Sequence, residues 1–500
     1  MPTTFALRRN IFILRIGFRL TVATAMIILS TIVVGCASLA SKGLLPEVLA
    51  RHPPDIQLGA ELILIEEPPE LVTSLIDTDG VVHLFLIDKD NQLQHIEILD
   101  DEIINREILG VIEKLEPWTV LDAIEHPRGK LRVIAGDKQY FHSAHNLSWQ
   151  EVKGNRCSRF VPIGDELFCA FVIKGEEIGA PERTDYTYGW FLLVPFVFWS
   201  HEQASKLVLA QESPNGWIVR AVVDPNTKMD ANSDFMVGTD NVGNVHLLYF
   251  TSKGGGAFIL FAGNYSGGAS GSAPEPELRY ARLRYNQLLA YSTDIQNQAS
   301  GNNSTPMQWM TIKGTPLTHK PFVKKDSNYN HAHIVLRPLS KNFSINKATG
   351  EVSGLMWAWV CTLDDGKRQL PLLGPDQSWV EVTIRNGQWS PGFNIVTAED
   401  YPTSNYSWSP FEQLIKIDPK GKRHVLLQGL EPAFWIPSRY MNYLAKEDAN
   451  WSAPLALGSS SLWSYGSLAI DDSGIAFVAW VNEEGKFIGR WIKPHSGDIQ

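Results

Sequence analysis

The feature that most constrains the fold is a short repeated unit in which an acidic turn leads into an apolar strand. The clearest copies begin at Asp77, Asp240 and Asp418, and each has a glycine three residues later and a histidine six residues later. Asp471 opens a further copy, with Phe477 in place of the histidine. Repetition of one short unit along a chain predicts an architecture of repeated sheets or helices rather than a single irregular core.

The residues of the unit have clear structural roles. An Asp or Asn side chain stabilises a tight turn, and glycine supplies the backbone conformation with positive φ that the turn needs. The strand that follows is apolar on both faces, as expected for a strand between neighbouring sheets. In a further copy we expect Asn330 to replace the glycine ahead of His333, and weaker copies begin at Gly129 and Gly164.

The spacing of the units predicts an all-β fold, a β-propeller of about seven four-stranded blades, with six or eight as alternatives. Many units are followed by a strand that contains tryptophan, at Trp149, Trp217, Trp309, Trp379 and Trp451. The last unit, at 467–493, has material for only two or three strands. We therefore expect an early strand at 60–66 to complete that sheet and close the ring, which removes exposed sheet edges.

The first 35 residues have the pattern of a secretory signal peptide. Residues 1–19 carry four arginines and no acidic residue, and the sixteen residues at 20–35 are uncharged. A helix of that length would span about 24 Å, less than the ~30 Å hydrocarbon core of a bilayer. A cleaved signal therefore fits better than a permanent span. The alternative is an uncleaved anchor helix that begins near Ile11.

The segment Val33-Val34-Gly35-Cys36 resembles the lipobox of bacterial lipoproteins. The resemblance implies cleavage before Cys36 and attachment of lipid to its thiol, which would anchor the chain in the membrane of the bacterial cell envelope. Together with the Pro-containing, small and polar composition of the next residues and the repeat, it leads us to expect a signal peptide at 1–35, a lipidated tether at 36–58 and a propeller domain at 59–500, facing the periplasm or the cell surface. Because Ala37 follows the cysteine, the outer membrane is favoured in a diderm cell.

The Asp-x-x-Gly-x-x-His units and the segment 446–452 resemble the sialidase-like, Asp-box type of β-propeller. In that segment Asp448, Asn450 and Trp451 carry the resemblance. The complete Asp-box order of Ser, Asp, Gly, Thr and Trp is not met, so the resemblance is to a style of repeat. It implies the propeller fold and does not imply sialidase activity.

The remaining cysteines divide by their surroundings. Cys157 and Cys169 flank an expected hairpin, and in an oxidising compartment they could form a disulfide that contributes about 3 kcal/mol. The alternative is a pair of buried free thiols. Cys361 lies in the apolar segment 356–361 and is interpreted as a core thiol.

The histidines suggest a metal site, because His331 and His333 would lie on the same side of a strand. However, His83, His246, His333 and His424 are expected to share one position of the repeat. A recurring position favours a structural role, with each imidazole bonded to a carbonyl of a neighbouring blade or loop. We therefore predict neither a metal ion nor a cofactor.

No catalytic constellation can be assembled from the sequence. A sialidase-like site needs clustered arginines and a pair of carboxyl groups, whereas Arg279, Arg282 and Arg284 are interpreted as an exposed strand face. The apolar run 188–199 is expected to form buried strands, the alternative being a loop that dips into a membrane or binds a partner.

The charge balance bears on the partners of the chain. The 44 Lys and Arg residues against 54 Asp and Glu residues give a net charge of −10, so nucleic acid is not an expected partner. The sequence favours a membrane-anchored, non-enzymatic propeller that binds a protein or a glycan, with a sialidase-like glycosidase on the same scaffold as the alternative. Fold alone does not choose between them.

Overall fold

A computed structural model describes residues 54–494 of the chain, apart from internal gaps. The longest gaps are 226–234, 261–275, 288–309, 317–330, 362–377 and 397–406. Cys36, the expected signal peptide and most of the expected tether lie outside the described residues. No helix within the described residues is both long and apolar enough to cross a membrane.

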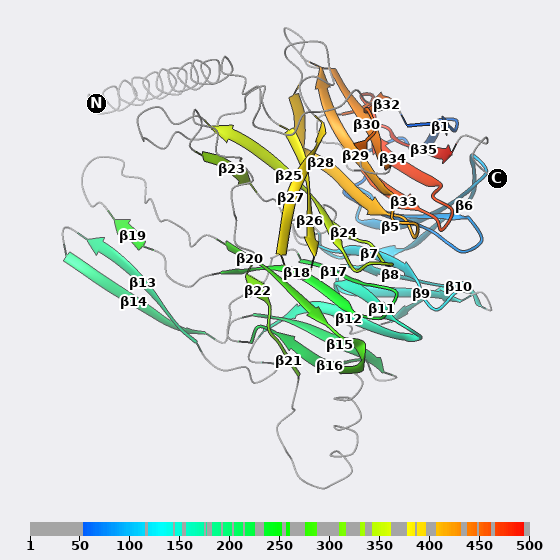
Figure 1. The fold of residues 1–500 in the computed structure, drawn as a ribbon. Helices are drawn as coiled ribbons and strands as arrows, with labels where there is room; N and C mark the ends of the chain where they lie inside the picture. Colours follow the sequence, from blue (N-terminus) through cyan, green and yellow to red (C-terminus); the bar gives the residue numbers. More distant parts are fainter. Residues whose placement is uncertain are drawn as a thin grey trace, which may run out of the picture.

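The structure confirms the all-β propeller and resolves its blade number to seven (Figure 1). Blade 1 consists of β3 (Leu71–Ile76), β4 (Val82–Ile87), β5 (Gln92–Leu99) and β6 (Glu102–Val111). Blade 2 consists of β7 (Leu121–Glu125), β8 (Lys130–Ala135), β9 (Lys138–Ser143) and β10 (Asn146–Val152). Blade 3 consists of β11 (Arg159–Ile163), β12 (Glu166–Ile173), β15 (Lys206–Ser213) and β16 (Gly216–Val223), with β21 (Met310–Ile312) added in parallel to β16.

The second half of the ring has more irregular blades. Blade 4 consists of β17 (Phe235–Thr239), β18 (Val245–Ser252), β20 (Pro276–Leu283) and β22 (Thr315–Pro316). In blade 5, β23 (His331–Val335) and β24 (Phe343–Ile345) both pair with β25 (Val352–Cys361), which is followed by β26 (Ser378–Arg385) and β27 (Gln388–Val396). Blade 6 consists of β28 (Ser407–Ile417), β29 (Arg423–Glu431) and β30 (Ser438–Glu447), with β31 (Asn450–Trp451) and β32 (Leu455–Ser459) on its outer side.

Blade 7 closes the ring with strands from both ends of the described chain. It consists of β33 (Ser467–Ile470), β34 (Ala476–Val481) and β35 (Phe487–Pro494), joined by β2 (Leu62–Ile65) and β1 (Ile56–Leu58). The closing strand expected at 60–66 is therefore confirmed. β1 also brings into the sheet the last residues of the segment expected to be a tether.

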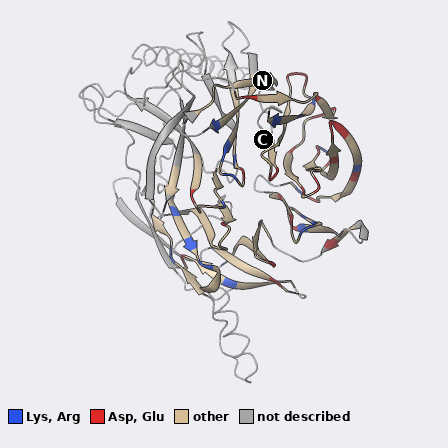
Figure 2. Cartoon of the chain, turned by 45° about the vertical axis from the view of Figure 1, so that its right-hand side comes forward, with Lys and Arg blue, Asp and Glu red and all other residues tan. Residues whose placement is uncertain are grey.

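The first strands of the blades form the inner ring. Each contacts the first strands of its two neighbours, in the order β3, β7, β11, β17, β24, β28, β33 and back to β3. Apolar clusters fill the space between adjacent blades, and Leu64, Val72, Phe477 and Phe487 belong to the cluster that joins blade 7 to blade 1. Basic and acidic residues both occur around the described part of the ring (Figure 2).

One glycine with positive φ lies between the first and second strands of every blade. The φ values run from 59° to 92° at Gly80, Gly129, Gly164, Gly243, Gly350, Gly421 and Gly474. In blade 5 this role belongs to Gly350 and not to Asn330, so the expected equivalence of His333 with the other repeat histidines is wrong. His333 lies on β23, whereas the strand after the blade's glycine turn is β25.

A three-stranded sheet stands outside the seven blades. The hairpin of β13 (Arg183–Phe191) and β14 (Val194–Glu202) is inserted between β12 and β15 of blade 3. β19 (Ala257–Leu260) is inserted between β18 and β20 of blade 4, and it pairs in parallel with β13. Figure 1 shows this sheet at the left, apart from the blades. The apolar run 188–199 lies on the hairpin.

Candidate functional site

In blades 4 and 6 the repeat builds an Asp–His–Tyr triad. The Nε2 of His246 lies 3.1 Å from Oδ2 of Asp240, and its Nδ1 lies 2.7 Å from the hydroxyl of Tyr280. In blade 6 His424 makes the same two contacts, with Asp418 and Tyr443. The imidazole therefore donates from Nε2 to the carboxylate and accepts at Nδ1 from the tyrosine hydroxyl.

Local geometry explains why the repeat assembles these groups. The Oδ1 atom of Asp240 accepts the backbone N–H groups of Val242 and Asn244 in the turn, and its Oδ2 atom accepts from the side-chain amide of Asn244 as well as from the histidine. On the neighbouring strand, His246 is opposite Arg282. Tyr280 is two residues before Arg282 and so lies on the same face of the sheet.

The charge states support a structural role for these two triads. Burial lowers the pKa values of His246 and His424, so both imidazoles are neutral at pH 7. Burial opposes ionisation of Asp240, but hydrogen bonds from Asn244 and His246 outweigh it and hold its pKa below the usual value. The histidines bond to groups of their own blade, and not to carbonyls of a neighbouring blade or loop as expected from the sequence.

Blade 1 departs from this arrangement at one position. His83 keeps the contact with its turn aspartate, because its Nε2 lies 3.0 Å from Oδ2 of Asp77. His83 is opposite Glu97 on β5, and the residue two positions earlier is His95 where blades 4 and 6 have tyrosine. The Nδ1 of His83 lies 3.0 Å from Nε2 of His95.

Two further side chains complete the cluster in blade 1. Oε1 of Glu107, on β6, lies 3.0 Å from Nδ1 of His95 and also accepts the indole N–H of Trp149, from blade 2, at 2.9 Å. Oε1 of Glu97 lies 3.7 Å from Nδ1 of His83 and 3.9 Å from Nε2 of His95. Among the described residues, His83, His95 and Glu97 offer ligand atoms that all lie within 4.8 Å of one another.

The cluster is buried on one side and open on the other. His95 is 1% exposed, and the ring of Phe85 stacks on it with the ring centres 4.6 Å apart. Burial lowers the pKa of His95 to about 4, with the nearby Glu107 acting in the opposite direction. The Glu97 side chain keeps 24% of its surface accessible to solvent. The Glu107 side chain is 37% exposed, so the open side of the cluster is at its two glutamates.

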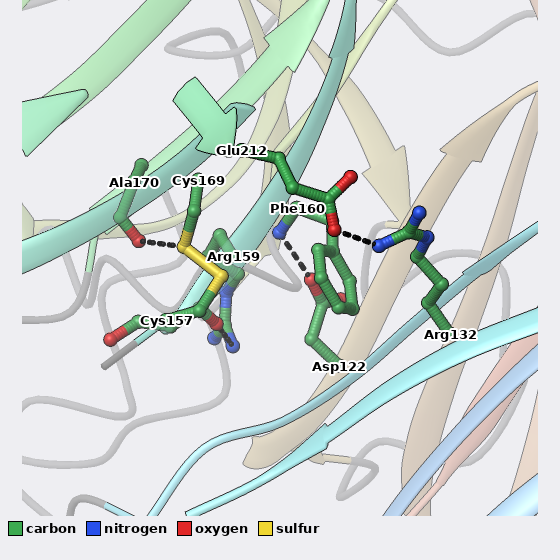
Figure 3. The surroundings of a disulfide bond; sticks show 9 residues. Asp122, Arg132, Cys157, Arg159, Phe160, Cys169, Ala170 and Glu212 are labelled. Atoms are coloured by element: carbon green, nitrogen blue, oxygen red, sulfur yellow. Dashed lines mark hydrogen bonds and ion pairs between the residues drawn. A yellow bond between two sulfur atoms is a disulfide. The ribbon is translucent and has the colours of Figure 1, made fainter. Parts of the chain in front are cut away.

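The structure joins Cys157 and Cys169 in a disulfide (Figure 3). Cys169 lies on β12, and Cys157 is close to the start of the paired strand β11, with the two Cα atoms 5.7 Å apart. Nearby, the backbone N–H of Phe160 donates to Asp122 of blade 2 at 2.9 Å. Burial raises the pKa of Asp122. The disulfide thus lies close to contacts that join blades 2 and 3.

The arginines considered for a sialidase-like site lie on a strand away from the axis. Arg279 and Arg282 are on β20, the third strand of blade 4, whereas the first strands line the axis. Nε of Arg279 lies 2.8 Å from Oδ2 of Asp224, and its guanidinium also donates to the carbonyl of Gly314 at 2.7 Å. Arg282 is 3.8 Å from Asp240. This arrangement gives the glycosidase alternative no support.

Sequence reasoning missed His95, Glu97, Glu107 and Trp149 as members of one cluster. The available signal was the alternation of His95 and Glu97, which places both side chains on one face of a strand next to the repeat histidine. The contribution of Glu107 depends on the register between β5 and β6, in which it is opposite His95. That register cannot be read from periodicity.

No model of a known protein family matches the chain, and no curated protein matches it in sequence. Among solved structures, the chain is similar to an ulvan lyase of a polysaccharide lyase family at 10% identity and a TM-score of 0.38, over 88% of this chain and 94% of that one. AofleA from Arthrobotrys oligospora matches at 11% identity and a TM-score of 0.35, over 81% of this chain and 89% of that one.

A lectin of Aleuria aurantia, in complex with alpha-methyl-L-fucoside, matches at 10% identity and a TM-score of 0.33, over 81% of this chain and 100% of that one. These similarities are too distant to carry an argument about function. The seven-bladed fold rests on the strand pairings and on the ring of contacts between first strands.

Proposed function

We propose that the protein is a lipid-anchored binding protein of the bacterial cell envelope, whose propeller holds a protein or glycan ligand near the membrane surface. The observation that carries the binding role is the sheet of β13, β14 and β19, which two neighbouring blades build together outside the ring. A rigid scaffold that carries elaborated connections on one side is typical of binding proteins.

The two insertions leave the ring at the same end. Each is inserted between the second and third strands of its blade, and in a propeller these connections lie on one side of the ring. The parallel pairing of Tyr188 with Ala257 continues to Phe191 with Leu260 and links the insertions into one sheet. Blades 3 and 4 therefore share one platform that the ring closure does not need.

The sequence of the hairpin suits recognition. Its twelve-residue run at 188–199 includes Tyr188, Trp190, Phe191, Phe196, Phe198 and Trp199. Tyrosine and tryptophan are enriched in protein interfaces because they combine a large apolar area with a polar group, and aromatic rings also stack on sugars. The composition therefore supports a recognition surface for either ligand class.

The proposed location rests on two independent features. The lipobox-like segment ends at Cys36, and the disulfide between Cys157 and Cys169 is the type of bond that persists in oxidising compartments such as the periplasm. Twenty residue steps separate Cys36 from Ile56, the first residue of β1, and a fully extended chain of this length spans at most about 70 Å. The lipid would thus hold the ring close to the membrane.

The anchor is tested by the variant Cys36→Ser in the producing bacterium. We expect this variant to lose fatty-acid labelling and to leave the membrane fraction, because a serine hydroxyl does not replace the thiol in lipid attachment. The disulfide variant Cys157→Ala is the matched control and should remain labelled. Continued labelling of Cys36→Ser would contradict the anchor.

The binding role is tested separately, with crosslinking and glycan arrays on the purified chain. Residues 183–202 are replaced by a short Gly-Ser linker, and a second variant carries Trp190→Ser with Trp199→Ser. We expect each variant to keep the wild-type far-UV circular dichroism of a β protein and to lose the ligands that the wild-type chain captures. Undiminished capture by both variants would contradict a binding role for the sheet.

A further inference from the structure

The proton positions on the two clustered histidines of blade 1 follow from their outer partners. A carboxylate only accepts hydrogen bonds, so Nε2 of His83, at 3.0 Å from Asp77, carries its proton. By the same reasoning Nδ1 of His95, at 3.0 Å from Glu107, carries its proton. A neutral imidazole has one N–H, so with both rings neutral the facing atoms Nδ1 of His83 and Nε2 of His95, 3.0 Å apart, would both present lone pairs, and only an added proton or a metal ion can join them.

Glu97 adds a third electron pair to the same space. Its Oε1 atom lies 3.7 Å from Nδ1 of His83 and 3.9 Å from Nε2 of His95. Lone pairs that face one another at these distances repel unless a proton or a metal ion lies between them, and measurement of bound zinc distinguishes the two. Two imidazole nitrogens and one carboxylate oxygen are the donor set of many zinc sites, where Zn²⁺ keeps a further position for water.

The triangle of the three atoms has the right size for such an ion. Its sides are 3.0, 3.7 and 3.9 Å. By plane geometry, a point equidistant from the three corners lies about 2.1 Å from each, which matches typical Zn–N distances of about 2.0–2.1 Å and Zn–O distances of about 2.0–2.2 Å. The three donor atoms therefore need little shift in position, whereas the two imidazole rings, 14° from parallel with their centres 5.2 Å apart, must turn so that both lone pairs meet at the ion.

From these observations we propose that His83, His95 and Glu97 bind one divalent transition-metal ion, with Zn²⁺ the best match to their donor atoms. The outer contacts support the assignment. A histidine that binds metal usually donates its other N–H to a carboxylate, which fixes the tautomer and the ring orientation. Asp77 and Glu107 provide this contact for the two histidines, and Trp149 in turn donates to Glu107.

The other triads explain why the site is in blade 1. In blades 4 and 6 the tyrosine hydroxyl donates to Nδ1 of the histidine and so satisfies its lone pair. In blade 1 the residue at this position is His95, whose proton points away toward Glu107. Replacement of a donor by an acceptor at this single position leaves the lone pair of His83 available to a cation.

Bound metal would join β4 to β5 and, through Glu107 and Trp149, tie blade 1 to blade 2. Among the three proposed ligands Glu97 is the accessible one, with 24% of its side chain exposed, so an ion could enter and a water molecule could occupy a fourth position. This inference does not depend on the proposed ligand-binding function of the sheet outside the ring.

The test is equilibrium dialysis of the purified full chain against Zn²⁺, with the bound metal counted by mass spectrometry. We expect one zinc ion per chain in the wild type. The variant His95→Tyr, which gives blade 1 the tyrosine of blades 4 and 6, should retain less than about a tenth of it. The matched control Tyr280→Phe changes the corresponding residue of blade 4 and should retain the full amount.

Two variants with smaller structural changes test the same zinc site if His95→Tyr fails to fold. Glu97→Gln removes a ligand at a partly exposed side chain. Asp77→Asn keeps the Oδ1 contacts of the turn but places an amide N–H against Nε2 of His83, which moves the imidazole proton to Nδ1. We expect Asp77→Asn, which changes an outer contact, to weaken zinc affinity about 10–100-fold, and Glu97→Gln, which changes a ligand, to weaken it at least as much. Absence of zinc from the wild type, or equal loss in Tyr280→Phe, would overturn the proposal.

Discussion

Blade 1 and blade 4 are built on the same repeat and differ in what stands beside the repeat histidine. In blade 4 the hydroxyl of Tyr280 fills the hydrogen-bonding capacity of His246, and the triad is complete. In blade 1 the corresponding residue is His95, and Glu97 stands where blade 4 has Arg282. Two differences on one strand thus separate a closed hydrogen-bonded triad from the cluster that we propose to bind a metal ion.

Blade 7 shows a third solution at the same position. The histidine is replaced by Phe477, which is opposite Trp491, and the residue two positions earlier is Gly489. A Cβ atom on Gly489 would lie 2.4 Å from the ring of Phe477, so the phenylalanine covers the glycine and no polar partner is needed. The repeat therefore fixes the turn and the strand pairing, while the chemistry of this one position changes from blade to blade.

The largest change is expected from transfer of the blade 1 pattern to blade 4. The double variant Tyr280→His with Arg282→Glu gives His246 the same neighbours that His83 has, while Asp240 keeps its contact with Nε2. Zinc content at saturating Zn²⁺ should rise from one to two ions per chain. The added site lacks a counterpart of Glu107, so its affinity should be about 10–100-fold weaker than that of blade 1. A folded variant that still binds a single ion would contradict the claim that these two positions decide whether a blade binds zinc.

The next largest effect is expected in blade 7. Gly489→Ala should destabilise the ring by about 1–3 kcal/mol, because the added methyl group meets the buried ring of Phe477. Urea unfolding monitored by tryptophan fluorescence measures the loss. Gly485→Ala serves as the contrast, since its added Cβ meets no atom within 4 Å and only its positive φ opposes the change. Equal stability of Gly489→Ala and wild type would contradict the covering role of Phe477.

A similar but smaller loss is expected when blade 4 loses its donor. Tyr280→Phe leaves Nδ1 of His246 buried without the hydroxyl that donates to it, at a cost of about 1–2 kcal/mol. The same urea experiment measures it. Addition of Zn²⁺ should not restore this stability, because blade 4 has the positively charged Arg282 where blade 1 has the proposed ligand Glu97. Recovery of stability with zinc would show that blade 4 can also bind the metal, contrary to the proposed difference between the two blades.

The smallest expected effect is on the pH dependence of stability. Burial lowers the pKa values of His246 and His424 in the folded state, so the unfolded chain binds more protons as pH falls below the usual histidine value near 6.5. Stability of the metal-free protein should therefore fall between pH 7 and about pH 5. The variant His246→Phe should show a shallower decrease over this range in urea titrations, and an unchanged slope would argue against a neutral buried imidazole.

Much of the ring could be predicted from the sequence because its determinants are local. The turn glycines Gly80, Gly243, Gly421 and Gly474 follow their Asp residues at a constant spacing, and the apolar strand comes directly after them. The closing strand was predictable because the last unit lacked strands and an early apolar segment was available. Blade 5 was placed wrongly because its turn runs from Asn346 to Gly350, one residue longer than the common spacing.

The candidate sites could not be predicted in the same way because they depend on contacts between distant residues. Pairing of β13 with β19 joins insertions of two blades, and nothing in either segment specifies the other. The metal cluster needs the register of β4, β5 and β6 together, since Glu97 is opposite His83 on β4 and Glu107 on β6 is opposite His95. Periodicity identifies strands, but it does not say which side chains become neighbours.

X-ray absorption spectroscopy at the zinc edge of the zinc-loaded full chain tests most directly whether blade 1, and not blade 4, binds the metal. We predict nitrogen and oxygen ligands alone, at about 2.0–2.1 Å, with the outer scattering of two imidazole rings. This signal should disappear in His95→Tyr and persist in Tyr280→Phe. A sulfur ligand near about 2.3 Å, or an unchanged imidazole signal in His95→Tyr, would contradict the assignment of the metal to blade 1.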